Sequence, residues 1–85
     1  LRVGRTWVVT GGSRGIGRAV VDRALAGGDT VVVLAGSAAR ADWPAGFGDR
    51  VLPVPVDVAD AGSVAAAFAR IRARTDTVDV LVNSA

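Results

Sequence analysis

Cysteine, histidine, tyrosine and lysine are all absent from this chain of 85 residues. Without cysteine, the chain has neither a disulfide framework nor a thiolate metal site, and without histidine it lacks the commonest metal ligand. No apolar run approaches the roughly 18 residues that a membrane-spanning helix needs. We therefore expect neither a metal centre nor a membrane partner.

The positive charge of the chain comes from one kind of side chain, because every basic residue is arginine. The net charge is only +2, and the sequence pI is near 11.0 because no side chain titrates between the carboxylates and the guanidinium groups. The densest basic cluster is Arg70, Arg72 and Arg74, which we interpret as the solvated face of a helix rather than a phosphate-binding patch. We expect no nucleic-acid partner.

The length and the hydrophobic content of the chain suit one small α/β domain. Hydrophobic residues make up 51% of the sequence, which excludes a disordered tail. A chain this short buries only about 60–65% of its unfolded surface, so we expect modest stability. The opening is charged, begins with Leu1 and has no apolar signal core. It therefore argues against an export signal, and the cytoplasm is the expected location.

Apolar, mostly β-branched runs predict strands at residues 6–9, 30–34, 51–56 and 78–82. The run at 30–34 shows no alternation, as in strands that are covered on both faces. Pro53 and Pro55 remove N–H donors from one side of the third strand, so that strand should lie at an edge. Together with right-handed crossovers, this predicts half of a doubly wound, Rossmann-type parallel sheet with strand order 3-2-1-4 and helices on both faces.

Helical spacing of apolar residues predicts a helix after the first strand and another after the third. The first begins near Ile16 and stops at Gly27-Gly28, and its apolar positions are Ala19, Val20, Ala24 and Gly27. Arg18 and Asp22 share its opposite face. The second helix is capped by Asp60 and turns an apolar stripe to the sheet: Val64, Ala67, Phe68, Ile71 and Thr75. Residues 37–50 are expected to form a loop or one short turn, with Trp43 and Phe47 closing the bottom of the core and a direct ligand role for them as the alternative.

A glycine-rich turn, from Thr10 to Gly17, joins the first strand to the first helix. Gly11, Gly15 and Gly17 allow the backbone to turn sharply and the helix to start close to the sheet. Free N–H groups and the positive end of the helix would then meet a phosphate. We interpret this turn as a pyrophosphate site, and the alternative is a tight turn that binds no ligand.

The pattern Thr-Gly-x-x-x-Gly-Ile-Gly resembles the short-chain dehydrogenase/reductase family, and Gly12-Ser13-Arg14 resembles its 3-oxoacyl-carrier-protein reductase branch. Asp57-Val58 matches the family's aspartate-apolar pair beside the adenine. Residues 81–85 match the start of its Asn-Asn-Ala-Gly segment, with Ser84 in place of the second asparagine. The likeness thus spans nearly the whole chain.

The resemblance implies that Asp57 accepts a hydrogen bond from the adenine amino group; the alternative is that Asp57 caps a nearby turn. It also implies that Asn83 braces the sheet and helps to place the ribose. Ligands of such sheets bind at the carboxyl ends of the strands. The residues expected to bind the cofactor are Gly11, Ser13, Arg14, Gly15, Ile16, Gly17, Gly36, Ser37, Asp57, Val58, Asn83 and Ala85.

The choice of coenzyme depends on the residues after the second strand. An acidic residue there would bond the 2′-hydroxyl of the ribose and repel a 2′-phosphate, but this chain has Gly36 and Ser37. Arg14 in the glycine turn can pair with a phosphate, so we expect NADP(H) rather than NAD(H). The alternative for Arg14 is a solvent-facing loop position, and Arg40 is a weaker second candidate.

The family implies hydride transfer between the nicotinamide and a carbonyl or alcohol, with a tyrosine acid and a lysine four residues further on. This chain has neither, so general-acid catalysis worth about 10²–10⁴-fold is missing. We expect residues 1–85 to be an NAD(P)-binding domain truncated before the catalytic segment and inactive alone, with a small-molecule substrate only if the catalytic half is present. Association through an exposed fourth-strand edge is also expected. The alternatives are a stand-alone nucleotide-binding module without chemistry and a non-functional remnant of a reductase gene.

Overall fold

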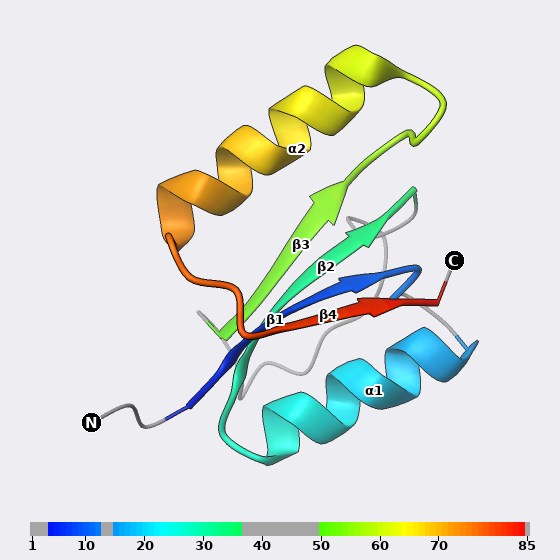
Figure 1. Cartoon of the computed structure of the whole chain (residues 1–85). Helices are drawn as coiled ribbons and strands as arrows, with labels where there is room; N and C mark the ends of the chain where they lie inside the picture. Colours follow the sequence, from blue (N-terminus) through cyan, green and yellow to red (C-terminus); the bar gives the residue numbers. More distant parts are fainter. Residues whose placement is uncertain (1–3, 13–14, 37–49, 85) are drawn as a thin grey trace.

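The computed structural model describes residues 4–12, 15–36 and 50–84. Along the chain, its elements are β1 (Thr6–Thr10), α1 (Gly15–Ala26), β2 (Thr30–Ala35), β3 (Val51–Pro55), α2 (Ala61–Arg74) and β4 (Val80–Asn83). The strands are all parallel and lie in the order β3-β2-β1-β4 (Figure 1). The predicted strand order is therefore confirmed.

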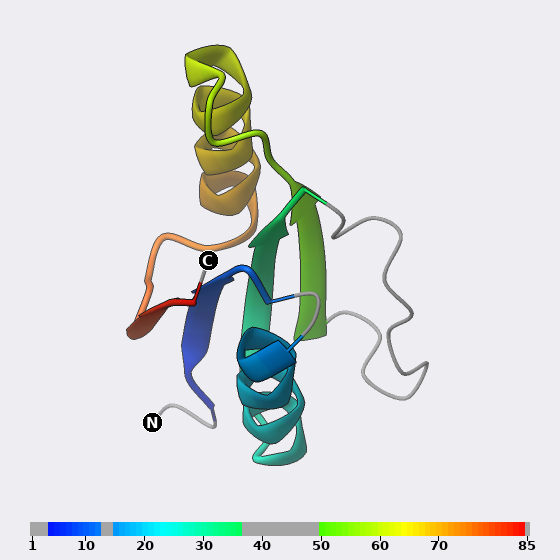
Figure 2. The same cartoon turned by 90° about the vertical axis from the view of Figure 1, so that its right-hand side faces the viewer.

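The two helices cover opposite faces of the sheet, as Figure 2 shows from the side. Because neighbouring strand residues point to opposite faces, β1 and β2 contribute to two cores. The core under α1 consists of Val9, Val21, Ala24, Leu25, Val31 and Val33. The core under α2 consists of Val8, Val32, Leu34, Val54, Ala67 and Ile71. This two-sided burial explains why the valine run of β2 shows no alternation.

Helix α1 begins one residue earlier than expected and buries a different face. Its buried residues are Gly17, Val21, Ala24 and Leu25, whereas Ala19 and Gly27 are exposed. Of the predicted apolar positions, only Ala24 is fully buried, and Val20 is half-buried against the core. Gly17 faces the Gly11 carbonyl after β1, and the larger apolar residues Val21 and Leu25 follow it on the same buried face. The Arg18–Asp22 pair is confirmed, with 3.1 Å between Nε and Oδ1.

Strand β3 lies at the edge of the sheet, as its prolines predicted. Val33 and Ala35 of β2 stand opposite Pro53 and Pro55, so β3 pairs with β2 on one side. The strand ends at Pro55 rather than at 56. Residues 37–49 lie outside the described residues, so the structure does not test the expectations for Trp43, Phe47 and Arg40.

Helix α2 is capped as expected, because the Asp60 Oδ1 accepts from the N–H groups of Gly62 at 2.9 Å and Ser63 at 3.4 Å. Ala67 and Ile71 are buried against the sheet, but Phe68 is 52% exposed, which corrects the prediction for that residue. The helix packs over β3, and Phe68 stands about 100° around the helix from Ala67, beyond this contact.

Strand β4 begins at Val80, two residues later than expected, and Val78 is exposed before it. Within the described ranges, neither helix has the length and apolar character to cross a membrane.

Candidate functional site

The carboxyl ends of the strands lie at one edge of the sheet, where the predicted ligand residues follow them (Figure 1). Gly11 comes directly after β1, Gly36 after β2 and Asp57 shortly after β3, while Asn83 ends β4. Strand order reverses between β1 and β4, since α1 and α2 carry the chain away on opposite faces. In open α/β sheets, ligands bind at this switch point.

The turn after β1 adopts backbone conformations that favour glycine. The φ angles of Gly11 and Gly15 are 67° and 64°, in the left-handed region where a side chain is strained. Apart from its chain neighbours and the backbone of its own helix, no described atom lies within 4 Å of a Cβ built on Gly15, so the described residues leave the first turn of α1 open on that side. Ser13 and Arg14, between these glycines, lie outside the described residues, as do Ser37 and Ala85.

Gly17 brings α1 into direct contact with the end of β1. A Cβ on Gly17 would lie 2.3 Å from the Gly11 carbonyl oxygen and 2.4 Å from the Ser84 Oγ, far inside van der Waals contact. The helix can approach the strand this closely only because residue 17 has no side chain. Its N-terminal N–H groups, which have no partners within the helix, therefore start right beside the turn.

Gly12 is a close-packed position that the sequence reasoning did not select. A Cβ there would meet Val33, Val21 and Val9 at 3.0 to 3.2 Å, so the turn rests directly on the core under α1. The sequence signal that could have identified Gly12 was its position within the glycine-rich pattern. Its role in the structure is packing, since it is buried.

Thr10 and Ser84 hold the base of the turn, and neither was selected from the sequence as a site residue. The Thr10 Oγ1 donates to the Asn83 Oδ1 at 2.8 Å, which ties the end of β1 to that of β4. The Thr10 carbonyl oxygen accepts from the Ser84 N–H at 3.2 Å and from the Ser84 Oγ at 2.7 Å. On the other side, the Gly11 N–H donates to the Leu34 carbonyl at 2.7 Å.

Asp57 begins a compact turn that leads from β3 into α2. Its N–H donates to the Ser63 Oγ at 2.9 Å, and its Oδ1 accepts from the Ala59 N–H at 3.0 Å. One carboxylate oxygen of Asp57, Oδ1, therefore caps the turn, as the alternative interpretation of this residue predicted. The described residues give its Oδ2 no hydrogen-bond partner, and Asp57 is exposed, so this oxygen can still accept a bond from a ligand.

Large apolar side chains are exposed at this edge. Ile16, in the first turn of α1, and Val58, beside Asp57, are each 81% exposed. Leaving such side chains in water forgoes about 1.5–3 kcal/mol each relative to full burial. Contact with a ligand would cover such side chains, and apolar contacts of this kind are typical of cofactor sites.

The charges at the site favour an anion. The first turn of α1 contains no acidic residue, so nothing within the helix opposes a negative group at its positive end. No set of three potential metal-ligating side chains occurs among residues 4–12, 15–36 and 50–84. The main-chain N–H groups at the start of α1, which have no partners within the helix, are suited to holding a phosphate.

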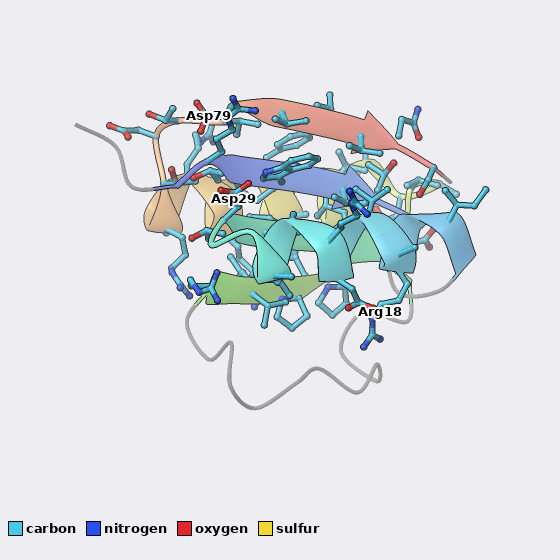
Figure 3. The ribbon with its side chains drawn as sticks, turned by 90° about the horizontal axis from the view of Figure 1, so that it is seen from below. Arg18, Asp29 and Asp79 are labelled. Carbon is cyan, nitrogen blue, oxygen red and sulfur yellow. The ribbon has the colours of Figure 1, made fainter. Side chains whose placement is uncertain are left out.

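A separate charged cluster occupies the amino ends of the strands, where Figure 3 shows Asp29 and Asp79, with Arg18 toward the opposite end. The Arg5 N–H donates to the Asp29 Oδ1 at 2.9 Å, and the Trp7 Nε1 donates to the Asp29 Oδ2 at 2.7 Å. These bonds, that of Arg5 first, lower the pKa of Asp29 below its usual 3.8. The Thr6 N–H donates to the Asp79 Oδ2 at 2.8 Å. This cluster joins β1 to the segments before β2 and β4.

The chain is similar to known proteins over nearly its whole length. The model of the short chain dehydrogenase family matches residues 5–85. The 2-(R)-hydroxypropyl-CoM dehydrogenase of Xanthobacter autotrophicus is 46% identical over 87 residues, which cover 95% of this chain and 34% of that protein. The 3-oxoacyl-[acyl-carrier-protein] reductase FabG of Aquifex aeolicus is 33% identical, over 96% of this chain and 35% of the relative. The chain thus spans about a third of the length of these relatives.

A solved structure is similar as well. L-sorbose reductase from Gluconobacter frateurii, complexed with NADPH and L-sorbose, superimposes with a TM-score of 0.77 at 35% identity. The superposition covers 96% of this chain and 33% of the reductase.

Proposed function

The chain belongs to the short-chain dehydrogenase family, and from this premise we propose that it is the coenzyme-binding part of an NADP(H)-dependent carbonyl reductase or alcohol dehydrogenase. Proteins of the family are oxidoreductases that use nicotinamide coenzymes. One observation carries the proposal. The left-handed turn at Gly11 and Gly15 leads into a helix whose first turn is open and free of acidic residues.

The pyrophosphate of the coenzyme would bind to the N–H groups at the start of α1. A helix N-terminus stabilises an anion by about 0.3–1 kcal/mol at an exposed site and up to about 2 kcal/mol when partly buried. Gly15 supports this role because a side chain there would be strained and would stand on the open side of the turn. Ser13 and Arg14 belong to this proposal from the sequence alone.

The adenosine half would extend toward β2 and β3. Asp57 would accept a hydrogen bond from the adenine amino group through the oxygen that its turn does not use, a contact worth about 1.5–3 kcal/mol. Val58 would cover one side of the base and Ile16 would lie beside the nicotinamide half, since both are exposed. Asn83 at the end of β4 would border the ribose, and Ala85 belongs to this part of the proposal from the sequence alone.

NADP(H) is the coenzyme that the residues after β2 favour. Gly36 is exposed and carries no carboxylate to repel a 2′-phosphate, and the similar L-sorbose reductase is complexed with NADPH. Ser37 and Arg14 complete this part of the proposal from the sequence.

When bound, the nicotinamide would exchange hydride with a carbonyl or alcohol carbon of a small substrate. This chain contributes binding and orientation, because no tyrosine or lysine is present to move a proton at the substrate oxygen. We propose that residues 1–85 bind coenzyme without turnover and that the catalytic groups belong to sequence beyond them. The β4 edge, where Leu81 is 68% exposed, would be covered by association.

A stand-alone nucleotide-binding module is the second candidate function, since the glycine turn and the open first turn of α1 would serve nucleotide binding without chemistry. The candidates differ in the downstream reading frame. A Tyr-x-x-x-Lys spacing there supports the reductase, whereas a stop codon directly after Ala85, together with coenzyme binding, supports the module.

The direct test is calorimetric titration of the chain with NADPH and NADH. We expect saturable binding, with NADPH the tighter ligand. Folding is checked first by circular dichroism. A chain that is folded and binds neither coenzyme contradicts the proposed function, while equal affinities contradict only the preference for NADP(H).

A further inference from the structure

Ser84 directs both of its hydrogen-bond donors at one atom. Its N–H lies 3.2 Å and its Oγ 2.7 Å from the carbonyl oxygen of Thr10, the last residue of β1. The same hydroxyl lies 3.5 Å from the Gly11 carbonyl oxygen. A hydroxyl has one hydrogen to donate, so the shorter contact to Thr10 is its hydrogen bond.

The atom that Ser84 holds belongs to the first peptide unit of the glycine turn. The Thr10 carbonyl and the Gly11 N–H lie in one rigid plane. Ser84 fixes its oxygen from β4, and the Leu34 carbonyl of β2 accepts its N–H at 2.7 Å. The plane is thus held from both sides immediately before Gly11 turns to a φ of 67°.

Ser84 also contacts the start of α1. The hydroxyl oxygen would lie 2.4 Å from a Cβ on Gly17, so it fills the space where a side chain of residue 17 would begin. The end of β1, the end of β4 and the first turn of α1 therefore meet at one hydroxyl group.

We propose that Ser84 is a positioning residue for coenzyme binding, which acts through the Thr10–Gly11 peptide and touches no part of the coenzyme. The inference rests on the proposed function. A turn that is fixed before binding loses less conformational entropy when the ligand arrives, so the hydroxyl contributes to affinity by preorganisation. The serine stands where the family's pattern has an asparagine, and its hydroxyl donates to the Thr10 carbonyl while it occupies the space beside Gly17.

The test compares Ser84→Ala with Trp7→Phe, a matched control. Each variant loses one side-chain hydrogen bond, that of Trp7 being its 2.7 Å bond to the Asp29 Oδ2 at the amino ends of the strands. NADPH affinity is measured by titration at a temperature at which every variant is folded, and hydrogen exchange of the Gly11 N–H is followed by NMR. Ser84→Cys, which keeps a side chain but donates a weaker hydrogen bond, is a further variant in case Ser84→Ala does not fold.

We expect Ser84→Ala to weaken NADPH binding by about threefold to tenfold, the range for one lost hydrogen bond, and to speed exchange of the Gly11 N–H. Ser84→Cys should lose affinity in the same direction. Trp7→Phe should keep its affinity within about twofold while its thermal midpoint falls. Equal affinities of Ser84→Ala and the unsubstituted chain would overturn this inference, and so would equal losses in Ser84→Ala and Trp7→Phe. Either result would leave the proposed function in place. A folded, unsubstituted chain that does not bind would contradict the proposed function as well.

Discussion

Replacing Gly17 with alanine tests the close contact between α1 and the end of β1. The added Cβ would lie 2.3 Å from the Gly11 carbonyl oxygen, 2.4 Å from the Ser84 Oγ and 2.9 Å from the Gly11 carbonyl carbon. Ordinary contact begins near 3.4 Å, so the new atom overlaps the Gly11 oxygen by about 1.1 Å. Two of these atoms are backbone, so rotation of a side chain cannot remove the overlap, and the helix or the turn must shift.

Overpacking of this kind costs about 1–3 kcal/mol, which corresponds to a fall of roughly 4–24 °C in the melting temperature of a domain this small. The shift also displaces the N–H groups at the start of α1, so NADPH affinity should fall. Melting is followed by circular dichroism and affinity by titration calorimetry.

Gly27→Ala is the matched control, because it makes the same change just beyond the other end of the helix. A Cβ there meets the Ala24 and Arg23 carbonyl oxygens at an ordinary 3.6 Å, and Gly27 is exposed. Its melting temperature should change by no more than about 4 °C, since surface substitutions stay within about 0.5 kcal/mol. If the two variants melt together and bind NADPH equally, the close approach of α1 to the turn is refuted.

Three further substitutions test separate parts of the account. Asp57→Ala should weaken NADPH binding by about 1.5–3 kcal/mol if its free oxygen bonds the adenine; Asp60→Ala, which removes only the cap of α2, should lower the melting temperature and leave the affinity unchanged. Gly36→Asp should reverse the preference toward NADH, because its Cβ has room, 3.9 Å from the Val56 carbonyl oxygen, and a carboxylate there repels a 2′-phosphate; an unchanged preference in parallel titrations argues against this placement of the ribose. The pKa of Asp29 is lowered in the fold by its bonds from Arg5 and Trp7, so its contribution to stability is present above its unfolded pKa and is lost as the pH falls through the folded pKa. Melting curves from about pH 5 to about pH 2 should therefore show a smaller loss in Asp29→Asn than in the unsubstituted chain, and parallel losses would contradict this origin of the acid sensitivity.

The strand order was predictable because it follows from local chemistry. Uninterrupted β-branched residues in β2 indicate burial on both faces, and two prolines with the same orientation cannot sit in a central strand. Once β3 is an edge strand and the crossovers are right-handed, few positions in the sheet remain for β1 and β4.

The buried faces of the helices were predicted less well. In α1, apolar spacing alone favoured Ala19 and Gly27, whereas the helix lies with Gly17 against Gly11 and Ser84 and buries Val21 and Leu25. In α2, Phe68 fits the apolar stripe but lies beyond the contact with β3. A hydrophobic pattern predicts how wide the apolar face of a helix is, but the contact with the sheet decides how that face is rotated.

Sequence by itself determined which segments become strands and helices and where the glycine turn lies, because these properties depend on residues that are near one another along the chain. Only the tertiary structure decided that Ser84 holds the Thr10 carbonyl from 74 residues away and that this hydroxyl fills the space beside Gly17. The physical reason is that such contacts arise when strands align in register and a helix docks on them, and neither distance is encoded in the spacing of a motif.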